Sequence, residues 1–131
     1  MVKMSNLITI DDLLGKAKEL KEVEKAKGYV KVKGYGKSIE IGKISVKEWA
    51  DIMDGSAVDK DAELVYSACL ALHDSHLIER LGCRNNPVDV VRKVFDNATV
   101  FHLANAIFEF SGLKTGLAED HIEKVVEEIK N

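Results

Sequence analysis

Four side chains with metal-binding chemistry lie near one another in the sequence: Cys69, His73, His76 and Cys83. Thiolates and imidazoles are the ligands of tetrahedral zinc, and Cys69 and His73, at positions i and i+4, would share one face of a helix. Their spacing, however, is not that of a recognised zinc motif. Cys69 also lies on an otherwise apolar stripe, where a thiol behaves as a small hydrophobic group. We therefore expect no bound metal and no other cofactor.

A catalytic site has less support. The sequence contains no nucleophile elbow and no Cys-x-x-Cys, and the glycines of Gly34-Tyr35-Gly36 fall in a turn instead of opening a phosphate-binding helix. His102 has the chemistry of a general base, but no acid or nucleophile adjacent in sequence accompanies it, which favours a hydrogen-bonded or interface histidine. The sequence favours a protein that is not an enzyme and has no catalytic residues.

Basic and aromatic side chains alternate in one short segment, which consists of Tyr29, Lys31, Lys33, Tyr35 and Lys37. Such a segment has the chemistry to contact phosphates and bases, and residues 86–110 resemble a helix-turn-helix in outline. The would-be recognition helix, residues 100–110, contradicts this interpretation because it has no Lys or Arg and carries Glu109. Lysines on a solvated hairpin face are also an ordinary device against aggregation. No nucleic-acid partner is expected, and a DNA-associated regulator is kept as the alternative function.

The composition is that of one ordinary globular domain. The chain has 131 residues, of which 46% are hydrophobic and 31% charged, so residues 1–131 are expected to form a single domain that needs no disulfide or metal. The first residues lack the apolar core of a signal peptide, and no stretch approaches the ~18 apolar residues of a membrane span. We expect a soluble protein of the cytoplasm with no membrane partner.

The net charge of −3 hides an asymmetry. Residues 1–43 hold ten lysines and six acidic residues, whereas residues 44–131 hold nine basic and sixteen acidic residues. The negative balance argues against a protein whose main task is to bind nucleic acid or an anionic membrane. The two oppositely charged parts are expected to attract each other within one chain or between copies.

The N-terminal part, residues 1–44, reads as a helix followed by a β-hairpin. Thr9 as a cap and the two acids after Ile10 predict a helix over 10–27. Because few of its residues are apolar, we expect this helix to be largely exposed. Alternating apolar and cationic residues predict strands at 29–33 and 38–44, joined by the glycine-containing turn.

From residue 45 the apolar period becomes helical, so residues 45–131 are expected to form a bundle of about five helices. The expected helical segments, including one short turn at 77–81, are 46–53, 59–72, 77–81, 87–95, 100–110 and 118–129. Ser45 with Glu48, Asn86, and either Asn97 or Thr99 are the expected caps. The fold class is therefore mainly α (α+β), with an N-terminal helix and hairpin before the bundle.

All four phenylalanines, at positions 95, 101, 108 and 110, fall within sixteen residues. Phe95 is expected in the core, but the side chains of helix 100–110 point in too many directions to be covered from one side. The candidate protein-binding residues are Phe101, Leu103, Ile107, Phe108, Phe110 and Leu113. Their covering partner can be the last helix, a second subunit or a client protein.

Several strings in the chain, spread over residues 9–113, occur in a familiar order. They are Thr9-Ile10-Asp11-Asp12-Leu13-Leu14, Val46-Lys47-Glu48-Trp49, Asp61-Ala62-Glu63-Leu64-Val65-Tyr66, Leu81-Gly82-Cys83, Asn86-Pro87-Val88-Asp89-Val90-Val91-Arg92-Lys93-Val94-Phe95, Leu103-Ala104-Asn105-Ala106-Ile107 and Ser111-Gly112-Leu113. In this order the chain resembles the tail assembly chaperones of long-tailed bacteriophages and of defective Bacillus prophages. None of these strings is a catalytic signature.

The resemblance implies a non-enzymatic function. Members of that family bind the tape-measure protein in the host cytoplasm, keep it soluble, assist tail-tube subunits to polymerise around it and are absent from the finished virion. In many such phages a ribosomal frameshift adds a longer C-terminal extension, which this sequence does not show. The expected partners are therefore the tape-measure protein, the tail-tube protein and further copies of the chain in a homo-oligomer.

Overall fold

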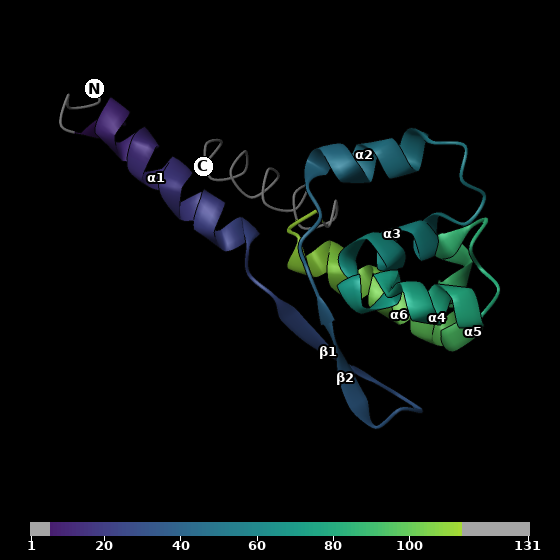
Figure 1. Cartoon of the computed structure of the whole chain (residues 1–131). Helices are drawn as coiled ribbons and strands as arrows, with labels where there is room; N and C mark the ends of the chain where they lie inside the picture. Colours follow the sequence, from purple (N-terminus) through teal and green to yellow (C-terminus); the bar gives the residue numbers. More distant parts are fainter. Residues whose placement is uncertain (1–5, 114–131) are drawn as a thin grey trace, which may run out of the picture.

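The computed structural model describes residues 6–113 and is mainly α with one two-stranded antiparallel sheet, which confirms the predicted fold class (Figure 1). The elements are α1 (Ile10–Glu24), β1 (Gly28–Val32), β2 (Lys37–Ile41), α2 (Val46–Asp54), α3 (Lys60–Ala68), α4 (Ser75–Arg80), α5 (Val90–Val94) and α6 (Asn97–Phe110), with 3-10 turns at Leu70–His73 and Pro87–Asp89. The helix expected at 118–129 lies outside the described residues.

Helix α1 extends away from the other helices and is exposed along its whole length (Figure 1). Its predicted cap is confirmed: the Thr9 hydroxyl accepts a hydrogen bond from the Asp12 amide at 3.1 Å, and the Asp12 carboxylate accepts one from the Thr9 amide at 3.0 Å. The helix ends at Glu24, three residues before the predicted end. An isolated helix of this length is marginally stable in water, so α1 depends on its cap and on any surface that covers it.

Gly15 lies in the middle of α1, and no neighbouring atom lies within 4 Å of the position that a Cβ would occupy there. Gly15→Ala is therefore expected to stabilise α1 by about 1 kcal/mol, because alanine loses less backbone entropy in a helix. Circular dichroism should show more helix. The control Gly34→Ala should lower stability, since Gly34 has a φ of +96°. An unchanged helix content in Gly15→Ala would contradict the marginal stability of α1.

The hairpin has one buried and one solvated face, as its alternation predicts. Val32 and Ile41 are buried, while Tyr29 and Lys31 are exposed. The Tyr35 hydroxyl donates a hydrogen bond to the carbonyl of Val94 at 2.6 Å, and its ring meets Phe95 edge-on at 5.9 Å. These contacts attach the turn of the hairpin to the end of α5.

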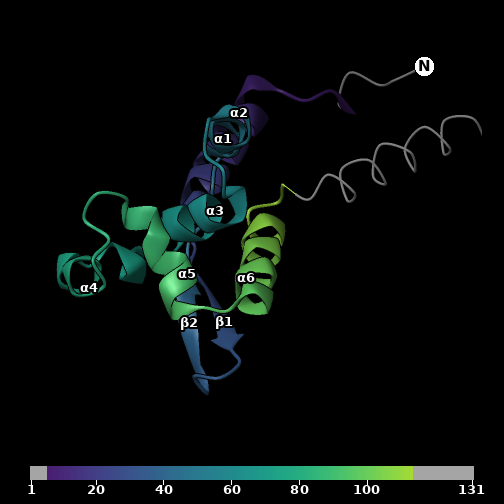
Figure 2. The ribbon, with the colours of Figure 1, turned by 90° about the vertical axis from the view of Figure 1, so that its right-hand side faces the viewer.

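The core lies between α3 and α6, with the hairpin and α5 completing it (Figure 2). Its fully buried side chains are Val65, Cys69, Val90, Val91, Val100, Leu103 and Ile107. Phe95, at 9% exposed, also belongs to it, as predicted. The apolar helix α6 is therefore a central element that buries one face.

Helix α3 is shorter than predicted. It ends at Ala68, where the sequence pattern continues to residue 72, because Cys69 takes an extended conformation (φ −109°, ψ 90°) and a 3-10 turn follows. The Ala68 carbonyl accepts a hydrogen bond from the Gly42 amide at 2.8 Å. The residue that follows β2 thus hydrogen-bonds to a carbonyl at the C-terminal end of α3. The predicted apolar stripe is nevertheless buried, including Cys69 and Leu72.

The expected caps were right for α2 and wrong for α5 and α6. Ser45 and Glu48 form the predicted capping box of α2. The first residue of α6 is Asn97 and its cap is Asp96, whose carboxylate accepts from the Thr99 amide at 2.8 Å. The Asn86 side chain donates to the Asp89 carboxylate and caps no amide, and a 3-10 turn precedes α5.

Candidate protein-binding surface

The structure separates the six candidate residues of 101–113 into three groups by their exposure. Leu103 and Ile107 are 0% exposed, because they lie on the face of α6 that packs against the core. They belong to the core of the domain and offer no surface to a partner. Phe101, by contrast, is 63% exposed and projects from the same helix.

Phe108, Phe110 and Leu113 are half-buried against other parts of the same chain. The Phe108 ring lies 5.8 Å from the Trp49 ring of α2. The Phe110 ring packs on Gly28, and the Lys43 ammonium lies 5.1 Å from the ring centre. These side chains are covered in part by α2 and the hairpin. The sequence had suggested other covering partners: the last helix, a second subunit or a client protein.

A larger apolar surface lies on the N-terminal residues, and the site prediction did not include it. The exposed large apolar side chains between residues 7 and 23 are Leu7, Ile8, Ile10, Leu13, Leu14, Leu20 and Val23. Five residues lie within about 120° of one another on α1 and are here called the α1 stripe: Ile10, Leu13, Leu14, Ala17 and Leu20. The signal was in the sequence, since these positions recur at three- and four-residue intervals on a helix that is otherwise charged.

The C-terminal end of α1 borders a groove of about 490 Å³. The apolar part of its lining comes from three parts of the chain, namely Leu20 and Val23 of α1, Ile44 and Val46 around the start of α2, and Leu113 after α6. The other lining residues are polar or charged: Glu24, Lys43, Ser45, Glu48 and Ser111. The Ser111 hydroxyl accepts a hydrogen bond from the Ile44 amide at 2.8 Å, which fixes the end of α6 against the chain that leads into α2. The α1 stripe therefore ends beside a groove whose lining is half apolar and half polar or charged.

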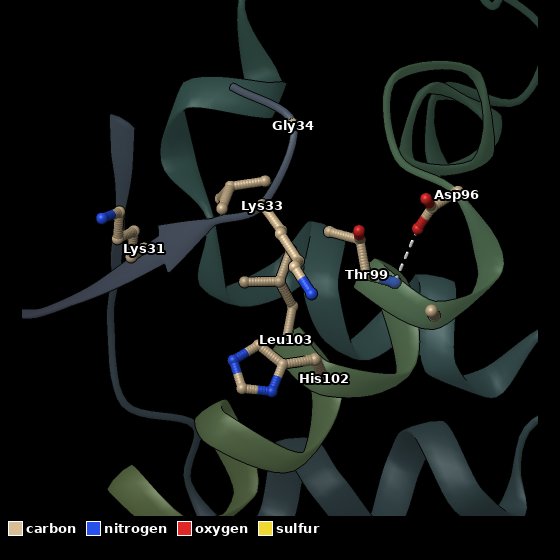
Figure 3. A pocket seen from close by; sticks show the side chains of 9 residues that line it. Lys31, Lys33, Gly34, Asp96, Thr99, His102 and Leu103 are labelled. Atoms are coloured by element: carbon tan, nitrogen blue, oxygen red, sulfur yellow. Dashed lines mark hydrogen bonds between the residues drawn. The ribbon is translucent and has the colours of Figure 1, made fainter. Parts of the chain in front are cut away.

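A second groove, of about 760 Å³, lies between the hairpin and the start of α6 (Figure 3). Lys33 points into it toward Thr99 and His102, whereas Lys31 extends to the other side (Figure 3). Asp96 borders the same groove, and its carboxylate accepts a hydrogen bond from the Thr99 amide at 2.8 Å. Hydrogen bonding to the side chain and the amide of Thr99 lowers the pKa of the Asp96 carboxyl. The groove therefore brings the side chains of Lys33, Thr99 and His102 together beside the capping carboxylate of Asp96.

The four candidate metal ligands have other environments. Cys69 is fully buried, and burial raises the pKa of its thiol to about 12, so it stays protonated. Nε2 of His73 lies 2.6 Å from the Tyr66 carbonyl, and its ring stacks on the Tyr66 ring at 4.2 Å. Within residues 6–113 no three His, Cys, Asp or Glu side chains are grouped as a metal site requires.

The lysines of the hairpin are exposed, as its solvated face predicts. Across the sheet Tyr29 pairs with Glu40, and Lys31 pairs with Ser38. An acid thus lies beside the aromatic side chain that would have to stack on a base, which reduces the attraction for phosphate. Of the helices in the part of the chain that the structure describes, none combines the length and the apolar character needed to cross a membrane.

The comparisons add no relative to this description. Comparison of the chain with protein families, with characterised proteins and with solved structures finds no match.

Proposed function

We propose that this chain is a tail assembly chaperone of a long-tailed phage or prophage. It binds the tape-measure protein by reversible apolar contact in the host cytoplasm, assists the tail-tube protein to assemble around it and is absent from the finished virion. The observation that supports this proposal is the exposed α1 stripe, on a helix that projects from the domain. The order of sequence strings over residues 9–113 supports the choice of client.

An exposed amphipathic helix suits this task physically. It recognises apolar helical surface without demanding a particular sequence, which a long client with many related segments requires. Each contact is weak, so several copies of the chain in a homo-oligomer bind one client by avidity. Phe101, exposed on α6, supplies a second apolar contact, separate from the α1 stripe.

Co-expression with the tape-measure protein of the same gene cluster tests the proposal, and the soluble fraction of that protein is the readout. The native chain is expected to raise the soluble fraction of the tape-measure protein, and the double variant Leu13→Ser with Leu20→Ser should abolish this increase. Burying a leucine contributes about 1.5 kcal/mol or more, so the loss of two weakens binding roughly a hundredfold. The matched control, Glu19→Ser with Glu22→Ser, alters exposed positions off the stripe and should retain the gain. An unchanged soluble yield with the native chain contradicts the proposal.

The exposed Lys31, Lys33 and Lys37 favour one alternative function, a DNA-associated regulator. It requires duplex binding that weakens steeply as salt rises, because each neutralised phosphate releases counterions. A flat titration of duplex DNA at low salt eliminates this alternative, while salt-dependent binding lost in Lys31→Ser with Lys33→Ser would favour it over the chaperone.

A further inference from the structure

The α1 stripe requires a cover for a structural reason that is independent of any client. A helix of 15 residues with a glycine at its centre is marginal in water, and α1 buries none of its residues in the described structure. Whatever packs on the stripe supplies the apolar burial that keeps α1 helical.

We propose that residues 114–131 of the same chain bind along the α1 stripe, antiparallel to α1. The proposal does not rest on the chaperone function and holds for any role of the domain.

The point at which the chain leaves the described structure supports this choice of occupant. Leu113 lines the groove at the C-terminal end of α1 together with Leu20 and Val23. Its amide donates a hydrogen bond to the Phe108 carbonyl at 3.0 Å, and Gly112 has a φ of +72°, so the exit of the chain is fixed there. The described chain therefore ends at Leu113, in the lining of the groove beside the α1 stripe.

The length and the apolar pattern of residues 114–131 match those of α1 as well. Eighteen residues follow Leu113, which correspond to roughly 27 Å as a helix, against about 22 Å for α1. The sequence places apolar residues at helical intervals within about 100°, namely Ala118, Ile122, Val125, Val126 and Ile129. The two stripes are therefore of similar length and width.

The charges favour the antiparallel direction. Glu119, Asp120 and Glu123 lie early in the segment, where an antiparallel arrangement brings them to the end of α1 that holds Lys18, Lys21 and Lys25, together with Glu22 and Glu24. In the same arrangement Lys130 approaches the two acids in the first turn of α1. These pairs agree with the overall charge distribution, in which residues 1–43 have an excess of basic side chains and residues 44–131 an excess of acidic ones.

Proximity favours the chain's own segment over a second copy. Only residues 114–117 separate the groove from Ala118, and so short a connection gives an effective concentration in the millimolar range. A second copy reaches that concentration only in very concentrated solution.

Cross-linking of the full chain tests the arrangement. Ala17→Cys with Val125→Cys places one thiol on each stripe, and the control Glu19→Cys with Val125→Cys moves the first thiol to the opposite face of α1. Cys69 and Cys83 are buried and should not compete for a short bis-maleimide. We expect the Ala17/Val125 pair to form a monomeric cross-link about tenfold faster than the control, at a rate independent of protein concentration. Equal rates for both pairs, or covalent dimers as the main product, would overturn the proposal.

Hydrogen exchange of the α1 amides gives a second test that needs no cross-link. Ile122→Asp places a charge on the stripe of the segment, whereas Lys124→Asp alters a position off that stripe. The α1 amides are expected to exchange about tenfold faster in Ile122→Asp than in the native chain, while those of the core stay unchanged. Lys124→Asp should leave α1 close to native. The same α1 exchange in the native chain and Ile122→Asp would also overturn the proposal.

Discussion

Leu103→Ala is expected to lower the free energy of unfolding by about 3 kcal/mol, whereas Phe101→Ala should change it by less than about 0.5 kcal/mol. Both residues lie on α6 and both belong to the apolar segment that the sequence marks as a candidate surface. Leu103 is 0% exposed in the core, so its truncation removes apolar burial and leaves a cavity. Phe101 is 63% exposed, and its removal leaves the packing intact.

Urea unfolding followed by the fluorescence of Trp49, the single tryptophan, measures both variants. Trp49 is half-buried beside Phe108 and reports the attachment of α2 to α6. Leu103→Ala should lower the midpoint at an unchanged slope, as expected for lost stability without a change in the surface exposed on unfolding. Similar midpoints for the two variants would contradict the assignment of these residues to core and surface.

The local parts of the fold were predictable because their signals lie within a few residues. The Thr9 cap of α1 and the capping box of Ser45 with Glu48 were predicted from residues at most three positions apart, and the structure confirms both. The structure adds that Asp12 completes a capping box with Thr9. The alternation in the hairpin likewise predicted that Val32 is buried while Lys31 is exposed. Such patterns need no knowledge of the rest of the chain.

The errors arise where a distant residue decides the local conformation. The apolar stripe of α3 continues past Ala68, yet the helix stops there, where the Ala68 carbonyl binds the Gly42 amide from the hairpin. Val46 is an apolar residue of the helix predicted over 46–53 but is 66% exposed, since that helix packs on the core through Trp49 and Ile52 instead. Sequence periodicity indicates which residues are apolar but not how much surface another element covers.

The candidate site shows the same limit. Sequence reasoning placed the binding surface on the most apolar segment, residues 101–113, where the structure uses Leu103 and Ile107 for the core. Helix α1 is less apolar in composition and was predicted only as an exposed helix, but among the described residues 6–113 none of its side chains is buried. Exposed apolar surface depends on the partners of an element as well as on its sequence, which is why the surface became visible only with the fold.

One ion pair joins three helices of the domain. The Arg92 guanidinium, on α5, donates to both carboxylate oxygens of Asp59 at 2.7 and 2.9 Å, and to the Asn97 side chain at 3.0 Å. Asp59 caps α3 by accepting from the Ala62 amide, and Asn97 is the first residue of α6. The hydrogen bonds of Arg92 hold the pKa of Asp59 below its ordinary value.

Arg92→Gln is therefore expected to destabilise the domain by about 1–2 kcal/mol at neutral pH, the range for charge-assisted hydrogen bonds reduced for their partial exposure. Because the folded pKa of Asp59 is depressed, the pair stabilises the protein above the unfolded pKa of about 4, and this stabilisation is lost as pH falls through the folded pKa. The difference between native and Arg92→Gln in urea unfolding should thus be full at pH 7 and shrink below about pH 4.

The matched control is Arg84→Gln, which removes a more exposed ion pair with Glu79, at 3.8 Å, and should cost little at any pH. Asp12 and Asp96 also have lowered pKa values, because each accepts hydrogen bonds at the start of a helix. They are present in all three proteins, so their acid sensitivity cancels in the comparison. A stability difference between native and Arg92→Gln that stayed constant from pH 7 to pH 2 would show that Arg92 acts through packing, and that the charge of Asp59 does not join α3 to α5 and α6.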